Sequence, residues 1–156
     1  MDPNKSRLIF SGIIATLALA VLMYAGPLAG FPNIDMAAAI GGFLDQPAIA
    51  FSARWWVGLA VFLAVGMIVS PLLFMQVRPS LYGSGWLRGL EWGVILWVFG
   101  GVCVMFNLGL AFHEPFISHP QLSTAVSFLG NLVYGALLGA LAARSGSINA
   151  RLAAGA

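Results

Sequence analysis

The sequence predicts an all-α, polytopic membrane protein with four transmembrane helices, both termini in the cytoplasm and a short interfacial helix in the first outer loop. Of its 156 residues, 60% are hydrophobic and 8% are charged, whereas a soluble domain carries about 25% charged residues. Four apolar windows have about the 20-residue length that a membrane-spanning helix needs. Positive charges are also distributed unequally between the two sides of this arrangement.

The four predicted spans form a single domain that covers residues 1–156. They are residues 8–25, 55–76, 92–112 and 122–143. The first window follows Lys5 and Arg7, as the apolar part of a secretory signal would. A cleavage site after Ala25 would need a small residue where Met23 stands, so we interpret this window as a retained helix.

Lys and Arg accumulate in cytoplasmic loops. With four spans, the N-terminus, the second loop and the C-terminus lie on one side. They contain Lys5, Arg7, Arg78, Arg88, Arg144 and Arg151. The two opposite loops contain only Arg54. We therefore expect both termini on the cytoplasmic side of the inner membrane of a bacterium.

The first outer loop is long enough to hold structure of its own. Asn33 or Asp35 can cap a short helix, and apolar residues follow it at helical spacing in "DMAAAIGGFLDQP". The pattern predicts a helix lying flat at the outer interface; the alternative is a lid over the bundle. Asp35, Asp45 and Arg54 form a predicted polar cluster on this side.

Ligand-type residues gather in the second outer loop, "AFHEPFISHP". His113, Glu114 and His119 have the spacing H-E-x4-H, which is not the H-E-x-x-H of metalloproteases. A zinc site needs three or four protein ligands, so Asp35 or Asp45 would have to complete a site. Turn-type prolines surround the histidines, and we favour an interfacial role. We predict no cofactor apart from bound lipid, and keep metal or haem contact as the alternative.

Small residues mark a helix-packing surface. Ser127, Asn131, Gly135 and Gly139 recur every four residues in the fourth window, and the third helix, which begins before its apolar window, offers Gly89, Gly93 and Gly100. Such stripes let two membrane helices approach closely. The partner is either this chain or, by self-association through the fourth helix, another copy. In the second window, Pro71 removes one backbone hydrogen bond and should bend the helix.

Several function classes are excluded or disfavoured. No ionisable residue lies deep in a predicted span, which argues against a proton-coupled transporter and against catalysis in the membrane core. The single Cys103 excludes an internal disulfide. A net charge of +2 is too small to indicate a nucleic-acid partner.

Three groups of motifs carry a resemblance: "MYAGP" with "FPNIDM", "WWVG" with a following "SP", and "NLVYGALLG". Together they resemble a bacterial family of small four-helix integral membrane proteins of unknown function. Members of that family often have a histidine in the second span, where this sequence has "GLAVFLAVG". The resemblance implies a fold and no activity.

These observations predict a non-catalytic membrane subunit that packs against a larger membrane complex, with a respiratory or photosynthetic energy-converting chain as the first choice. Its expected partners are other integral membrane subunits and lipid. One alternative is a small oligomeric channel or transporter, lined by Ser70, Asn107, Asn131 and Tyr134. The other is a haem- or quinone-handling redox protein that uses the outer histidines.

Overall fold

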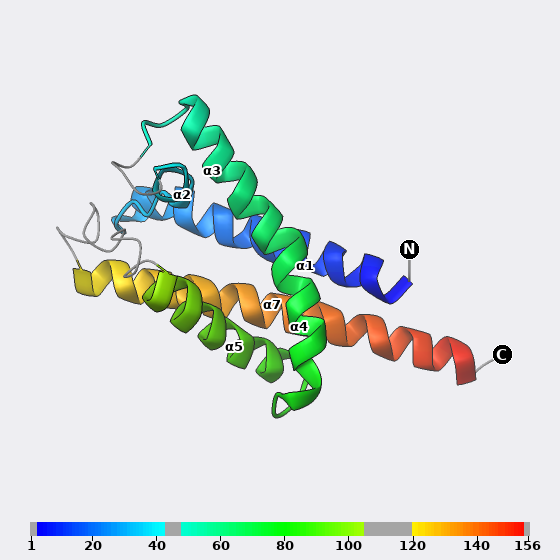
Figure 1. The fold of residues 1–156 in the computed structure, drawn as a ribbon. Helices are drawn as coiled ribbons and strands as arrows, with labels where there is room; N and C mark the ends of the chain where they lie inside the picture. Colours follow the sequence, from blue (N-terminus) through cyan, green and yellow to red (C-terminus); the bar gives the residue numbers. More distant parts are fainter. Residues whose placement is uncertain (1–2, 43–47, 105–119, 155–156) are drawn as a thin grey trace.

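The computed structural model describes residues 3–42, 48–104 and 120–154, and every regular element in these ranges is helical. Helix α1 (Pro3–Ala25) runs antiparallel to α7 (Pro120–Ala154), so both ends of the chain lie at one end of the molecule (Figure 1). Within these ranges, three helical segments are long and apolar enough to cross a membrane: Lys5–Ala29, Ala53–Ser80 and Gln121–Arg144. They contain the predicted windows 8–25, 55–76 and 122–143.

A short helix follows the first span. After the 3-10 turn η1 (Gly26–Ala29) comes α2 (Met36–Gly41), with Asp35 as its N-cap. A Cβ atom at Gly58 would overlap the carbonyl oxygen of Ala37, so the glycine allows α2 to lie directly against the second span. The expected short helix is therefore present, and its main contact is with α3.

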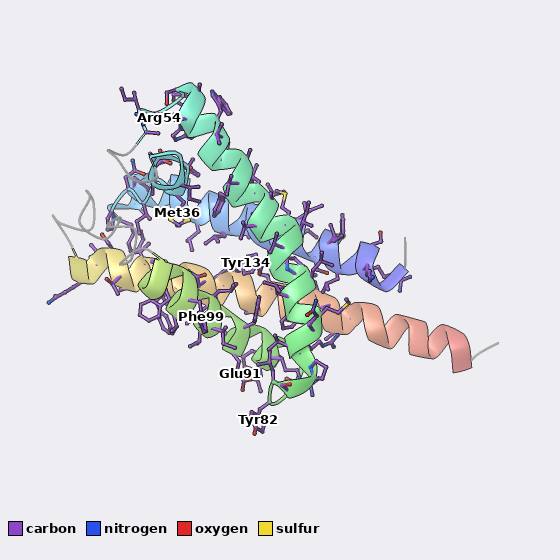
Figure 2. The ribbon with its side chains drawn as sticks, viewed as in Figure 1. Met36, Arg54, Tyr82, Glu91, Phe99 and Tyr134 are labelled. Carbon is purple, nitrogen blue, oxygen red and sulfur yellow. The ribbon has the colours of Figure 1, made fainter. Side chains whose placement is uncertain are left out.

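The second span is one continuous helix with a change of pitch. It consists of α3 (Ala53–Ala64), the π-helical turn η2 (Val65–Val69), α4 (Ser70–Val77) and the 3-10 turn η3 (Arg78–Ser80). Arg54 and Tyr82 lie at opposite ends of it (Figure 2). The ribbon continues through Pro71 with a π turn immediately before the proline, which accommodates the ring without ending the helix.

The third predicted span is described in part. Helix α5 (Gly85–Leu96) continues into the π-helical segment η4 (Trp97–Val104). Residues 105–112 of the predicted window lie outside the described residues. Among the described elements, α5 has its largest contact with α7, and the two lie side by side in Figure 1.

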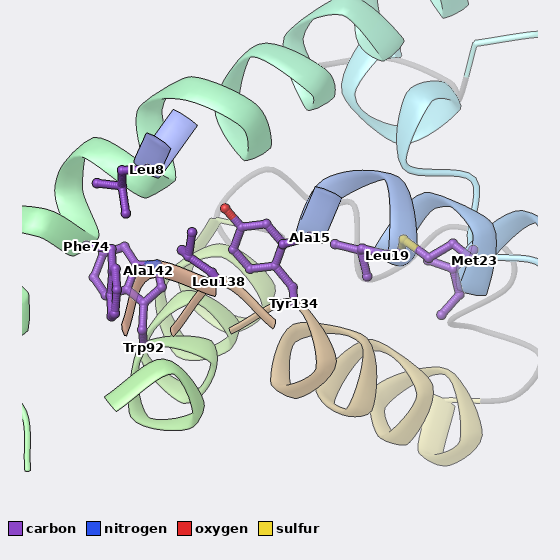
Figure 3. Close-up of a cluster of buried hydrophobic side chains, with 10 residues drawn as sticks. Leu8, Ala15, Leu19, Met23, Phe74, Trp92, Tyr134, Leu138 and Ala142 are labelled. Carbon is purple, nitrogen blue, oxygen red and sulfur yellow. The ribbon is translucent and has the colours of Figure 1, made fainter. Parts of the chain in front are cut away.

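The core lies where the spans meet (Figure 3). Tyr134 and Leu138 of α7 stand at its centre, with exposed fractions of 2% and 0%. The other buried members come from α1, α4, α5, α7 and the segment before α2: Leu8, Ala15, Leu19, Met23, Ile34, Phe74, Trp92 and Ala142. The interior is thus mainly apolar, and the few polar side chains within it bond to particular partners.

Candidate functional site

The glycine stripes of the third and fourth predicted spans meet within this chain. A Cβ atom at Gly89 would overlap the carbonyl oxygen of Gly135, and one at Gly135 would overlap that of Gly89. Gly139 lies against Gly85 in the same way, and a Cβ at Gly93 would overlap the carbonyl oxygen of Asn131. The backbones of α5 and α7 are therefore in direct contact, and this face of α7 is occupied by α5.

The remaining residues of the predicted packing set are Ser127, Asn131 and Gly100. Ser127 is buried, and its carbonyl oxygen accepts a hydrogen bond from the Asn131 side chain at 2.9 Å. The Asn131 amide thus bonds within its own helix, and Asn107, the other asparagine of the channel alternative, lies outside the described residues. At Gly100, an added Cβ would meet no described atom within 4 Å, so the structure places this glycine outside the contact.

Polar groups surround the π turn where α1 crosses the second span. The Ser70 amide donates to the carbonyl of Val65, five residues earlier. In the same pattern, the next amide would bond to Gly66, but residue 71 is a proline and has no N–H. The hydroxyl of Tyr134 donates to the Gly66 carbonyl oxygen at 2.6 Å instead, and Figure 3 shows this hydroxyl directed at the second span. Tyr134 therefore supplies the donor that Pro71 lacks.

At this crossing, small residues allow α1 and the second span to approach each other closely. A Cβ atom at Gly12 would overlap the ring of Pro71, and one at Gly66 would stand 2.6 Å from the hydroxyl oxygen of Thr16. The Thr16 hydroxyl itself donates to the Gly12 carbonyl oxygen at 2.7 Å. The Thr16 hydroxyl proton is thus used within α1.

A second side-chain bond ties α4 to α5. The indole N–H of Trp92 donates to the Ser70 hydroxyl at 3.0 Å, and both residues are buried. The Trp92 ring also contacts that of Phe74, with centroids 6.1 Å apart. Ser70 and Tyr134, which the channel hypothesis places on a water path, are therefore buried and hydrogen-bonded in this structure.

We predict that Tyr134→Phe lowers the free energy of unfolding by about 1–2 kcal/mol, because it leaves the half-buried Gly66 carbonyl without the tyrosine donor. Thermal unfolding in a mild detergent measures the loss. In a Pro71→Ala background the restored amide can bond to that carbonyl, so the same substitution should cost less. An equal cost in both backgrounds would show that the hydroxyl does not replace the missing amide.

Asp35 joins three helices at the other end of the molecule. One carboxylate oxygen accepts from the Ala38 amide at 2.9 Å and from the Tyr24 hydroxyl at 3.0 Å. The second oxygen accepts from the indole N–H of Trp55 at 2.8 Å. Tyr24 belongs to α1, Ala38 to α2 and Trp55 to α3, so one side chain holds the ends of these helices together. We call it the Asp35 junction.

An aromatic cluster lies beside the Asp35 junction. The Trp55 and Trp56 rings meet edge to face with centroids 4.9 Å apart, and Phe51 lies 5.1 Å from Trp55. Trp55 is buried, whereas Phe51 and Trp56 are exposed. Edge-to-face contacts of this kind add to the stability gained from burial. They fix the indole that donates to Asp35.

The predicted outer polar cluster is only partly described. Arg54 lies at the start of α3 next to the Asp35 junction and has an exposed side chain (Figure 2). Asp45, His113, Glu114 and His119 lie outside the described residues, so their predicted contacts stay predictions. Among the described residues there is no group of three or more His, Cys, Asp or Glu side chains that could hold a metal ion.

Two hollows among the described residues differ in volume and in lining. One, of about 60 Å³, lies between α1, η1 and α7, and its walls include Met23, Phe31 and Val126. A small-molecule site usually measures about 300–1,000 Å³, so this hollow is too small for a quinone ring. The other, of about 470 Å³, lies between the first turns of α1 and the last apolar turns of α7 and is lined by Arg7 and Arg144.

Comparison with known proteins places the chain in a family. Residues 6–153 match the family of unknown function DUF6789. The chain belongs to this family. No curated protein and no solved structure matches it. Membership in DUF6789 agrees with the expected resemblance to a family without known activity, and the structure adds a helical fold with three candidate membrane spans.

Proposed function

We propose that this DUF6789 protein is a non-catalytic membrane subunit that packs laterally against a larger membrane complex, with an energy-converting complex as the first class to test. The observation that carries the proposal is the uncovered face of the second span. Only 22% of its apolar window is buried within the chain, against 39% for each of the other two candidate spans. Of the three candidate spans among the described residues, the second therefore has the most surface left to offer a partner.

The uncovered face is a regular ridge. Val57, Val61, Val65 and Ile68 follow helical spacing along α3 and η2, and between 42% and 62% of each side chain is exposed. Branched side chains of this kind have one strongly preferred rotamer in a helix. They lose little conformational freedom when another helix covers them, so the ridge is well suited to helix packing. We call it the valine ridge.

The path of α3 supports the same interpretation. Contact between α1 and the second span is concentrated at η2 and α4, and α3 moves away from α1 towards its own start (Figure 1). Its main partner there is the short α2. Association of membrane helices depends on van der Waals packing. A helix that leaves its bundle therefore gains most from a second protein surface.

The test uses two variants with the same change of size. Val61→Trp places a bulky ring on the valine ridge, and Val21→Trp places it on the exposed surface of α1. Each chain is purified in mild detergent, and co-purifying polypeptides are quantified by mass spectrometry. We expect integral membrane partners at a constant ratio with the parent and with Val21→Trp, and a loss of at least about tenfold, or 1.4 kcal/mol, with Val61→Trp.

Two results would contradict the proposal. One is a stable homo-oligomer that contains no other polypeptide. The other is an equal amount of partner with Val61→Trp and Val21→Trp, because the valine ridge would then face lipid. For the channel alternative, liposomes that hold the purified chain should show no flux of ions or small neutral solutes, since Ser70 and Tyr134 bond within the bundle.

The proposal includes an orientation. Both termini lie at one end of the molecule in Figure 1, and four spans with the positive charges on that side place them in the cytoplasm. We predict that cysteines introduced at Ser6 and Ser147, in a Cys103→Ala background, are protected from a membrane-impermeant reagent added outside the cell. Labelling of either position from outside would contradict the charge argument.

A further inference from the structure

We propose that the larger hollow is a binding site for an anionic phospholipid, with the phosphate held by Arg7 and Arg144. The hollow measures about 470 Å³ and lies between α1 and α7. Arg7 lies close to the start of the first candidate span and Arg144 ends the third. Lipid phosphates lie at this depth, where a spanning segment meets water. The inference is independent of the proposed function.

The polar part of the hollow matches a phosphate. Arg7 and Arg144 come from two different helices and both line it, together with Ser6. Arginine binds phosphate through paired N–H groups, and its guanidinium carries five donors. Both arginines also make interactions within the protein, and five donors leave room for a phosphate in addition.

The apolar part of the hollow matches the start of an acyl chain. Phe10 and Ile14 line it one and two helical turns after Arg7, and they are 63% and 36% exposed. Leu141 lines it from α7, one turn before Arg144. The stripe from Arg7 to Ile14 extends roughly 10 Å along α1 at 1.5 Å per residue. A lipid bound by its phosphate would lay its first methylene groups on this wall.

The charge of the hollow determines which lipid headgroup fits it better. None of its lining residues is acidic: Ser6, Arg7, Phe10, Ser11, Ile14, Leu141 and Arg144. The buried Ser11 hydroxyl is neutral and donates to the Arg7 carbonyl oxygen at 3.0 Å. A zwitterionic headgroup brings a cation that would find no carboxylate among these residues. A headgroup with net negative charge is therefore the better match, as at basic sites between membrane helices in general.

The experiment measures lipid retention by native mass spectrometry of the full chain. The detergent-solubilised protein is mixed with phosphatidylglycerol or with phosphatidylcholine of the same acyl chains. We expect retention of one phosphatidylglycerol in preference to phosphatidylcholine. Arg7→Gln and Arg144→Gln should each weaken it about fivefold, the factor that corresponds to one basic residue near an anionic headgroup. Arg78→Gln is the matched control, because Arg78 lies on the second span and does not line the hollow.

Two further measurements distinguish a bound lipid from free phosphate. Phe10→Ala, at an exposed side chain, should weaken phosphatidylglycerol retention without lowering the melting temperature, because it shortens the apolar wall. Inorganic phosphate should not displace the lipid. Equal retention of the two lipids, or an equal effect of Arg78→Gln and Arg7→Gln, would overturn the proposal. Displacement by inorganic phosphate with no effect of Phe10→Ala would also overturn it, since the site would then take free phosphate.

Discussion

Gly135→Ala is expected to destabilise the protein although alanine is the better helix former. A Cβ atom at this position would overlap the carbonyl oxygen of Gly89 and would stand 2.8 Å from the amide nitrogen of Gly93. Both neighbours are backbone atoms, which cannot turn aside as the end of a side chain can. Overpacking a close contact costs about 1–3 kcal/mol. We expect about 3 kcal/mol here, and failure of α5 to dock on α7 in Gly135→Leu or Gly139→Leu.

Thermal unfolding of the detergent-solubilised protein measures this effect, and Gly100→Ala is the matched control. Nothing described lies within 4 Å of a Cβ at Gly100. Alanine there should be neutral or should stabilise by up to about 1 kcal/mol, the usual gain over glycine in a helix. If Gly135→Ala, Gly135→Leu and Gly139→Leu all melt like the parent, the stripe of α7 is not in close contact with α5.

The spacing of small residues predicts part of this contact. Gly135 and Gly139 recur with a period that matches one helix face, so the sequence predicts a close approach on α7. It does not reveal the partner, because a stripe looks the same whether it meets its own chain or a copy. The glycines predicted for the third helix include Gly100, which lies in η4, and omit Gly85, the first residue of α5. A strict four-residue period through Gly89 and Gly93 would have indicated Gly85 instead.

The hydrogen bond from Tyr134 at the π turn cannot be predicted from the local sequence. Pro71 predicts a lost backbone hydrogen bond in the second span. Which carbonyl loses its donor depends on the pitch of the helix before the proline, and which side chain replaces that donor depends on how α7 packs. Tyr134 lies 68 residues from Gly66 in the sequence. Its role therefore follows from tertiary packing.

The sequence predicts Asp35 as a possible helix cap and as a member of a polar cluster with Asp45 and Arg54. The cap is present, since its carboxylate accepts from the Ala38 amide. The Asp35 carboxylate also accepts from Tyr24 and Trp55, which are neutral donors. Neutral donors do not stand out in a pattern of charged residues, and aromatic residues at span ends are usually interpreted as interface markers. The sequence pattern therefore predicts the cap at Asp35 but not the junction.

Asp35→Ala is expected to lower the free energy of unfolding by about 2–3 kcal/mol. Loss of the N-cap of α2 contributes about 1 kcal/mol. Hydrogen bonds to a charged group contribute about 1.5–3 kcal/mol each when shielded from water, and the partial exposure of the junction reduces that amount. The Trp55 indole N–H and the Tyr24 hydroxyl both lose their acceptor. Thermal unfolding and far-ultraviolet circular dichroism measure the loss of stability and of helix.

A double-mutant cycle with Trp55→Phe separates the indole bond from the cap. Phenylalanine keeps an aromatic ring beside Phe51 and Trp56 but has no N–H to donate. If Asp35 accepts from Trp55, the two substitutions together should cost about 1 kcal/mol less than the sum of the single losses. Asn33→Ala is the matched control, because this exposed polar side chain precedes the same helix and has no bond to the three helices among the described contacts. Additive losses, or an equal loss with Asn33→Ala, would mean that Asp35 does not hold α1, α2 and α3 together.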